Sequence, residues 1–156
     1  MTPPIVCNTG PLIALSLISG QDILCQLYHP IITRTVLAEW AEGEDDAPRI
    51  LPATHEIVPA PAVNPLLAVQ LDPGEASVIQ TALDRGIRRV LIDERKGRKI
   101  ARRVCGLETL GTAGLLVEAK RRGLITNIAP LFGLLEEHSY WIAKPIVEWA
   151  LHTAGE

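Results

Sequence analysis

Short apolar runs alternate along the chain with longer amphipathic segments, and turn residues separate the two kinds. The short runs, rich in branched side chains, predict buried strands over residues 4–7, 30–32, 56–59, 89–92 and 107–110. Apolar positions at helical spacing predict helices, beginning near Pro11 and ended by Gly20, and over residues 22–28, 34–42, 64–70, 73–85, 96–105, 112–122, 128–137 and 145–154. The alternation favours an α/β fold, a three-layer α/β/α sandwich with a central, mainly parallel sheet.

The pattern contains no internal repeat, linker or low-complexity segment. The 156 residues are about the length of one domain, so we expect a single domain over residues 1–156. The most polar stretch, residues 43–48, is expected to be a solvent-exposed loop between a helix and the next strand.

Composition excludes several classes of protein. Hydrophobic residues make up 47% and charged residues 21%, which excludes a disordered tail or a coiled coil. Neither a signal peptide nor an apolar run of ~18 residues is present, so a cytoplasmic protein without a membrane partner is expected. The three cysteines are widely spaced and the four histidines are isolated. This pattern favours reduced cysteines in the core over a disulfide framework, and does not favour a histidine-centred metal site.

Polar side chains follow two of the predicted strands, where functional sites of parallel sheets gather. Asn8 and Thr9 come after the first strand, and Asp93 and Glu94 come at the end of the strand over residues 89–92. Each pair has a structural interpretation, because such residues also cap helix N-termini. The alternative is that Asp93 or Glu94 ligates a divalent cation.

Two further acids have a similar ambiguity. Glu75 lies in Asp72-Pro73-Gly74-Glu75, which matches a capping box, but its side chain can instead turn inward from the first helical turn. Glu39 is either a solvated helix residue or part of the same site. If Glu39, Glu75 and Asp93 converge, they form an oxygen-lined Mg²⁺ or Mn²⁺ site. Such an ion lowers the pKa of a bound water and neutralises charge on a phosphate, as in metal-dependent nucleases.

The distribution of charge changes the picture given by the total of −3. Residues 1–84 carry 2 bases and 10 acids, a net of −8, whereas residues 85–156 carry 13 bases and 8 acids, a net of +5. The stretch from Arg85 to Arg103 alone holds nine bases, and Arg95, Lys99 and Arg103 follow one another at a spacing of four residues. A basic helix face of this kind is either simply solvated or suited to a polyanion. No aromatic residue lies among these bases, so base stacking is not expected there.

Several longer strings resemble the PIN-domain proteins, and in particular a prokaryotic branch often found beside an antitoxin. The strings are IVCNTGPLIAL, LDPGEASVIQTAL, VLIDERKGRKIARR and LGTAGLLVEAKRRGLI, and the resemblance covers nearly the whole chain. It implies a parallel α/β/α sandwich and a Mg²⁺- or Mn²⁺-dependent endoribonuclease that is the toxin of a type II toxin–antitoxin pair. The partners implied are RNA, a cognate antitoxin and a second copy in a homodimer.

The resemblance also assigns site residues. The family's acids fall on Asn8, Glu39, Glu75 and Asp93, and its hydroxyl positions fall on Thr9 and Thr112. The resemblance implies that the three acids hold the ion with Asn8 as a neutral ligand, and that Thr9 or Thr112 orients water or phosphate. From the charge pattern, we expect four basic residues to contact the RNA backbone: Arg95, Lys96, Arg98 and Lys99.

Asn8 departs from the family pattern, because an amide oxygen supplies no negative charge to a hard cation. A second hypothesis is therefore a non-catalytic PIN-like module that binds RNA or protein. A nucleotide-binding regulator is disfavoured, because no glycine-rich phosphate loop follows the first strand.

Overall fold

A computed structural model describes residues 1–43 and 48–156 of the chain. Most of the predicted solvent loop, residues 44–47, lies outside the described residues.

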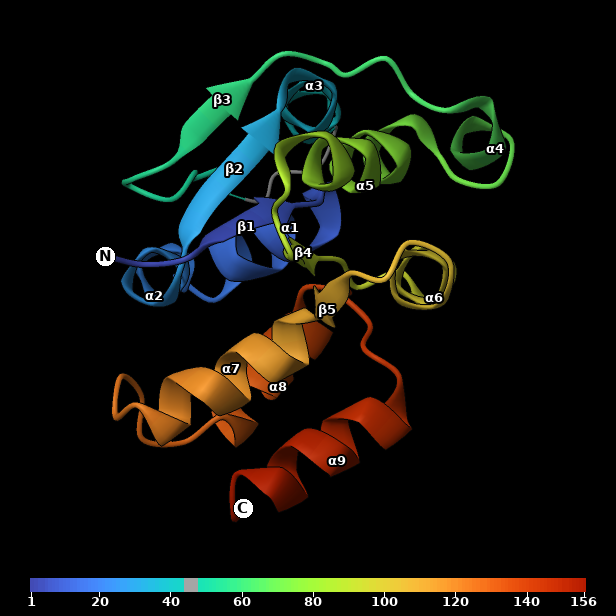
Figure 1. Ribbon diagram of the computed structural model, residues 1–156. Coiled ribbons are helices and arrows are strands. Elements are labelled where there is room, and N and C mark those ends of the chain that lie inside the picture. Colours follow the sequence, from blue (N-terminus) through green and yellow to red (C-terminus); the bar gives the residue numbers. More distant parts are fainter. Residues whose placement is uncertain (44–47) are drawn as a thin grey trace.

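Five parallel strands form the central sheet. They are β1 (Pro4–Cys7), β2 (His29–Thr33), β3 (Glu56–Val58), β4 (Arg89–Leu91) and β5 (Glu108–Leu110). Their order across the sheet is β3-β2-β1-β4-β5, and every neighbouring pair runs parallel (Figure 1). The sheet confirms the predicted α/β class and shows that all five predicted strands belong to one parallel sheet.

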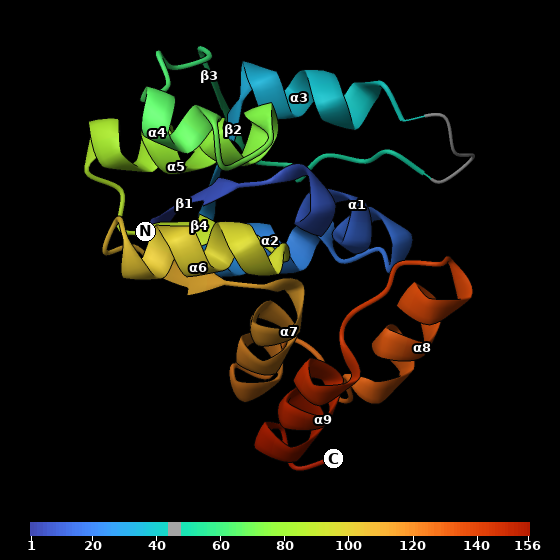
Figure 2. The same cartoon turned by 90° about the vertical axis from the view of Figure 1, so that its right-hand side faces the viewer.

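Helices cover both faces of this sheet, as the two ribbon views show (Figure 1 and Figure 2). Helices α3, α5 and α6 lie on one face, where α5 contacts β1, β2 and β4. Helices α1, α2 and α7 lie on the other, and α8 and α9 pack against α1 and α7. The helix bounds are α1 (Thr9–Leu17), α2 (Gln21–Leu27), α3 (Arg34–Ala41), α4 (Pro65–Ala68), α5 (Pro73–Arg85), α6 (Arg95–Arg103), α7 (Thr112–Arg121), α8 (Ala129–Glu137) and α9 (Lys144–Thr153).

Local sequence signals explain where α5 begins and ends. The Asp72 carboxylate accepts a hydrogen bond from the Glu75 N–H at 2.8 Å, and Pro73 occupies the first turn, where its missing N–H costs nothing. Gly86 ends the helix in the left-handed region at φ 64°, which a residue without Cβ adopts without strain. The predicted bounds of this helix are confirmed.

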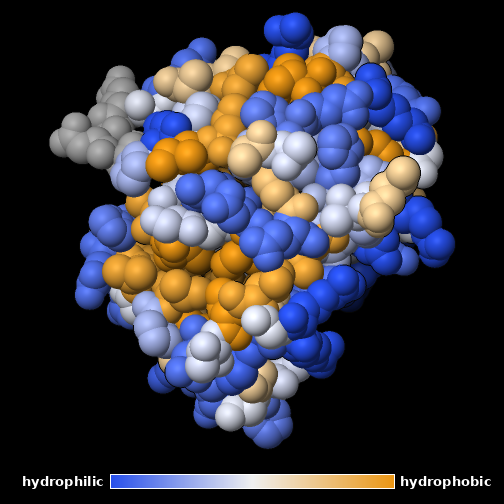
Figure 3. All heavy atoms as spheres, turned by 90° about the vertical axis from the view of Figure 1, so that its left-hand side faces the viewer, coloured by the Kyte–Doolittle hydropathy of each residue, from blue (hydrophilic) through white to orange (hydrophobic). Residues whose placement is uncertain are grey.

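The core consists of buried apolar side chains from the sheet and its covering helices. Ile5, Val6 and Cys7 in β1 and Val90 and Leu91 in β4 are fully buried, as expected for the centre of a parallel sheet. The three cysteines are free, and Cys25 and Cys105 are only half-buried. On the side where α2 and β3 lie, hydrophobic residues form patches that hydrophilic residues separate and border (Figure 3).

None of the described helices is by itself long and apolar enough to cross a membrane. Helices α1 and α2 pass that test only as a pair bent by 120°.

The topology fixes where a functional site can form. From β1 the chain continues outward to β2 and β3, and then returns to β4 on the opposite side of β1. The sheet order therefore reverses between β1 and β4. At such a switch point the carboxyl ends of the strands open a crevice, and Asn8 and Asp93 follow these two strands.

Candidate functional site

Asn8 lies at the end of β1 with its side-chain oxygen unsatisfied. Its backbone N–H donates to the Leu91 carbonyl at 2.9 Å, which joins the ends of β1 and β4. Asn8 occupies the N-cap position of α1, but its side chain makes no capping hydrogen bond. Its Oδ1 atom is buried and has no hydrogen-bond partner. Because a buried amide oxygen without a partner costs about 1–3 kcal/mol, this atom is better explained by an external ligand than by helix capping.

Glu39 joins three helices through its carboxylate. Oε2 accepts from the Thr9 hydroxyl at 2.9 Å, and Oε1 accepts from the Gly74 N–H at 3.0 Å. A Cβ at position 74 would lie 2.2 Å from Glu39 Oε2, so only glycine lets α5 approach this carboxylate so closely. The interpretation of Glu39 as a solvated surface residue is wrong.

Glu75 turns inward from the first turn of α5, and 6% of its surface is exposed. Burial raises the pKa of its carboxyl group from 4.5 to about 8, and its hydrogen bond to Asp72 and the nearby charges of Asp72, Glu94 and Glu39 add to the effect. The charged groups named here, Asp72, Glu94 and Glu39, are all acids. The capping box is therefore only half formed: Asp72 caps the helix, whereas the Glu75 side chain faces the acid cluster.

Asp93 is half-buried at the end of β4 and accepts three hydrogen bonds. The Thr112 N–H donates to Oδ1 and the Thr112 hydroxyl donates to Oδ2, each at 2.6 Å, and the Tyr140 hydroxyl also donates to Oδ2. Glu94, at the N-cap of α6, makes no side-chain capping bond. The interpretation of the pair as a cap for α6 is thus wrong, because Asp93 instead holds the first residue of the neighbouring helix α7.

Two residues of this cluster, Tyr140 and Asp72, were not predicted from the sequence as site residues, and Glu94 was predicted only as an alternative ligand to Asp93. Tyr140 reaches Asp93 from the segment between α8 and α9, and burial together with the Asp93 charge raises its pKa. Asp72, through a hydrogen bond and its charge, and Glu94, through its charge, raise the pKa of Glu75. Tyr140 has no local signal at all, since 47 residues separate it from Asp93. The adjacent pair Asp93-Glu94 was visible in the sequence, but the direction of Glu94 was not.

The residues fit a hard divalent cation in donor type and in charge. All are oxygen donors, Asn8 offers an unused buried oxygen, and the charges of Asp72, Glu94 and Glu39 act on Glu75. In residues 1–43 and 48–156, however, no three His, Cys, Asp or Glu side chains are grouped so as to hold an ion together. Glu39 and Asp93 instead accept hydrogen bonds from the protein.

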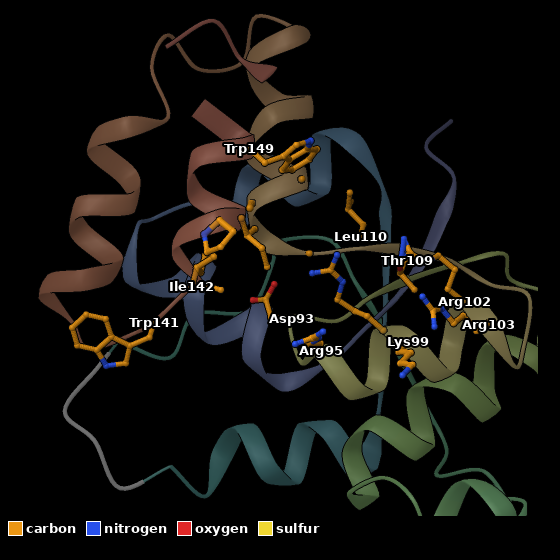
Figure 4. A pocket seen from close by; sticks show the side chains of 17 residues that line it. Asp93, Arg95, Lys99, Arg102, Arg103, Thr109, Leu110, Trp141, Ile142 and Trp149 are labelled. Atoms are coloured by element: carbon orange, nitrogen blue, oxygen red, sulfur yellow. The ribbon is translucent and has the colours of Figure 1, made fainter. Parts of the chain in front are cut away.

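A groove of about 840 Å³ runs alongside Asp93, between the cations of α6 and the C-terminal segment (Figure 4). Arg95, Arg98 and Lys99, three of the four predicted RNA contacts, line it, and Lys96 does not. Arg102 and Arg103 of the same helix also line it. The opposite wall carries Trp141 and Trp149. These residues come from another part of the sequence than α6, so the sequence of α6 does not predict that they line the groove.

Comparison with known proteins agrees with this arrangement. No curated protein and no solved structure matches the chain. The family described as "PIN domain" matches residues 4–156, nearly the whole chain. A parallel sheet covered by helices, with Asn8 after β1 and Asp93 after β4, agrees with the sandwich that the resemblance implied, apart from the amide at position 8. The chain therefore belongs to the PIN-domain family, whose fold is of the nuclease type.

Proposed function

We propose that this protein is a metal-dependent endoribonuclease that hydrolyses phosphodiester bonds of RNA with Mg²⁺ or Mn²⁺. The observation that carries the proposal is a buried oxygen-donor site at the switch point: Asn8 Oδ1 is buried without a hydrogen-bond partner, and Glu75, 6% exposed, is affected by the charges of Asp72, Glu94 and Glu39. Acids gathered at a switch point without a counter-charge favour a divalent cation. The cationic groove beside Asp93 supplies a path for a polyanion.

In this proposal Asn8, Glu39, Glu75 and Asp93 hold the ion, which supplies a water of lowered pKa and neutralises charge on the phosphate. Thr9 and Thr112 act by positioning carboxylates, because their hydroxyls donate to Glu39 and Asp93. This assignment replaces the expectation that either hydroxyl orients water or phosphate directly.

Four basic residues are proposed to contact the RNA backbone: Arg95, Lys96, Arg98 and Lys99. Three of them line the groove, so the phosphates of a bound strand would lie along α6. Lys96 is exposed outside the groove lining and would contact only RNA that extends beyond it.

The proposal extends to the toxin role. A cognate antitoxin would cover the groove and Asp93, and the toxin would form a homodimer. A short upstream reading frame that overlaps this gene would support the pairing, and co-expression of both products should suppress the toxicity of this chain. Toxicity that persists with the neighbouring product present would refute the antitoxin assignment.

The test of the activity is RNA cleavage with Mn²⁺ by the wild type and by Asp93→Asn. This variant keeps the shape of the side chain but removes the charge at the end of β4, so we expect cleavage to fall by about tenfold or more. Asp22→Asn, an exposed position in the first turn of α2, is the matched control and should keep full activity. Wild-type levels of cleavage by Asp93→Asn would exclude the assigned site.

A second candidate function is a non-catalytic module that binds RNA or protein. It is favoured by the neutral Asn8 and by the lack of a three-acid group among the residues that the structure describes. Calorimetric titration with Mn²⁺ separates the two functions. The nuclease requires ion binding that weakens in Glu75→Gln and Asp93→Asn, whereas the module predicts no binding that depends on these side chains.

A further inference from the structure

Tyr140 reaches Asp93 from the segment between α8 and α9 and uses one of its carboxylate oxygens. Oδ2 accepts hydrogen bonds from the Tyr140 and Thr112 hydroxyls, whereas Oδ1 accepts one from the Thr112 N–H. Because each carboxylate oxygen offers about two lone-pair directions, both directions of Oδ2 are used and Oδ1 has one left. While Tyr140 stays in place, the ion of the proposed function can therefore meet Asp93 through one oxygen only.

The two hydroxyls on Oδ2 are not equally free to leave. Thr112 holds Asp93 a second time through its backbone N–H at 2.6 Å, and it is the first residue of α7, so the helix fixes its position. Tyr140 donates through its single hydroxyl and lies outside the regular elements, between α8 and α9. An ion that needs Oδ2 would thus displace the tyrosine and not the threonine.

The backbone at the end of α8 directs Tyr140 toward the site. Ser139 is in the left-handed region at φ 59°, which a residue with a Cβ adopts at a cost. The Ser139 N–H donates to the Glu136 carbonyl at 2.9 Å. The Tyr140 N–H donates to the Leu135 carbonyl at 2.8 Å, which completes the paired bonds of a Schellman motif. Because such costly conformations cluster at functional sites and switch regions, this turn favours a role for Tyr140 beyond filling space.

Helix α1 fits closely around the Tyr140 hydroxyl. A Cβ at position 10 would lie 3.1 Å from the hydroxyl oxygen, so Gly10 leaves just enough room for it in the first turn of α1. Burial and the charge of Asp93 raise the pKa of Tyr140, so its hydroxyl keeps the proton that it donates. The donor, the acceptor and the space for this contact thus come from three separate parts of the chain.

We propose that Tyr140 is a positioning residue that restrains Asp93 and thereby lowers the affinity of the site for its divalent cation. The inference rests on the proposed function for the existence of an ion site, and it adds a residue that regulates this site. It explains why residues 1–43 and 48–156 contain no group of three acids arranged to hold an ion: α7 and Tyr140 hold Asp93 in another orientation. Displacement of the hydroxyl would also release the segment between α8 and α9.

Calorimetric titration with Mn²⁺ of the wild type, Tyr140→Phe and Tyr28→Phe tests the inference without catalysis. Tyr140→Phe keeps the ring and frees Oδ2 of one donor, so its Kd for Mn²⁺ should fall by about threefold to tenfold. Tyr28→Phe is the matched control and should keep the wild-type Kd. Tyr28 is also buried and donates to a carboxylate, Glu118 Oε2 at 2.7 Å, but it precedes β2 and so lies at the opposite end of the sheet.

The direction of the change separates this role from a merely structural one. A tyrosine that only stabilises the fold predicts that its loss leaves ion binding unchanged or weaker. The inference predicts that Tyr140→Phe binds the ion more tightly although it loses a hydrogen bond of the folded protein. A Kd in Tyr140→Phe that is equal to or higher than that of the wild type would overturn it.

Gly10→Ala tests the same contact while leaving Asp93 and Tyr140 in the chain. Its methyl group would lie 3.1 Å from the Tyr140 hydroxyl oxygen and press on it, so the Kd for Mn²⁺ should fall by about twofold or more. In the Tyr140→Phe background the methyl group meets no hydroxyl, and Gly10→Ala should add nothing. A change of the same size in both backgrounds, including no change in either, would refute the contact as the cause.

Trp141 directly follows Tyr140 and is 71% exposed, so its fluorescence reports the release of this segment. Saturating Mg²⁺, which is not paramagnetic, should shift the emission of the wild type, and Trp141→Phe should remove this shift. Tyr140→Phe should show the shifted emission before Mg²⁺ is added. An emission spectrum that Mg²⁺ does not change, or a shift that remains in Trp141→Phe, would refute the release of the segment.

Failure of this inference can be told apart from failure of the proposed function. Mn²⁺ binding that requires Glu75 and Asp93 but has the same Kd in Tyr140→Phe supports the ion site and refutes the role of Tyr140. Tighter Mn²⁺ binding in Tyr140→Phe, without RNA cleavage by any variant, supports the role of Tyr140 and refutes the nuclease. An absence of Mn²⁺ binding by both the wild type and Tyr140→Phe refutes both.

Discussion

Replacing Glu75 with glutamine should change how the stability of the protein depends on pH. In the folded protein burial, aided by Asp72, Glu94 and Glu39, raises the pKa of Glu75 from 4.5 to about 8. Between these two pH values the folded state holds a proton that the unfolded state has lost. The free energy of unfolding therefore falls as the pH rises from about 4.5 to about 8, and levels off above that.

The size of the effect follows from the same two values. At about 1.4 kcal/mol per pKa unit, the upper bound is about 5 kcal/mol. The neighbours Asp72 and Glu94 are exposed, so solvent screens part of this repulsion and we expect a loss of about 1–3 kcal/mol. The glutamine side chain in Glu75→Gln would mimic the protonated acid at every pH. The variant should therefore match the wild type near pH 5 and exceed its stability by that amount at pH 8.5.

Urea unfolding at pH 5.5 and pH 8.5 in EDTA measures the difference. Glu136→Gln is the control, because it removes an exposed carboxylate on α8 away from the cluster and should not alter the pH profile. Mn²⁺ should stabilise the wild type more at pH 8.5 than at pH 5.5, since it binds the ionised carboxylate, and this gain should shrink in Glu75→Gln. A difference between wild type and variant that stays constant with pH would refute the reasoning.

Three further predictions concern the same cluster. Asn8→Asp should raise Mn²⁺ affinity about tenfold in calorimetry, because it adds a charge at the unpartnered buried oxygen; an unchanged affinity would remove Asn8 from the site. Gly74→Ala should displace the Glu39 carboxylate and break its 3.0 Å bond, lowering the free energy of unfolding by about 1–2 kcal/mol in urea; wild-type stability would contradict this close approach. Tyr140→Phe should cost about 1–2 kcal/mol, because it keeps the ring but leaves Asp93 without one donor; thermal unfolding that matches the wild type would show that this bond contributes nothing.

The sequence predicted the elements of the fold closely because their signals are local. The branched runs of β1 and β4 are fully buried, and the Asp72 cap and Gly86 fix the two ends of α5. Helix α1 begins at Thr9 and not near Pro11, because Asn8, whose backbone is extended, already occupies the N-cap position. That the chain forms one domain over residues 1–156 stays a prediction.

The site was only partly predictable, because capping signals and site signals share the same residue types. Asp72 proved to be the cap of α5 and also a neighbour of Glu75 in the acid cluster. Asp93 caps α7 and not α6, because β5 places Thr112 beside it in space. No periodicity encodes these contacts, since they depend on how crossover connections stack helices on the sheet. The roles of the individual site residues stay predictions.

The positions of Trp141 and Trp149 beside the groove could not be predicted from the local sequence, for the same reason. Trp149 lies in the predicted C-terminal helix and Trp141 lies in the segment before it, and both are exposed. The packing of α9 on α7 places Trp149 at the groove that α6 lines, and the segment between α8 and α9 places Trp141 there. A search for aromatic residues among the bases of α6 therefore misses the two tryptophans on the other side of the groove.

The uneven charge along the sequence becomes a separation of charge in space. Asn8, Glu39 and Glu75 come from the acidic first half of the chain, and the groove cations come from the basic second half. Among the described residues no ion pair joins the α6 cations to these acids, and Asp72, Glu94 and Glu39 add to the effect of burial, which raises the pKa of Glu75. The fold keeps both sets unneutralised at neighbouring places, at a cost in stability of a few kcal/mol. In the proposed function, a cation at the acids and a polyanion along α6 would offset that cost, and the total charge of −3 does not indicate either of them.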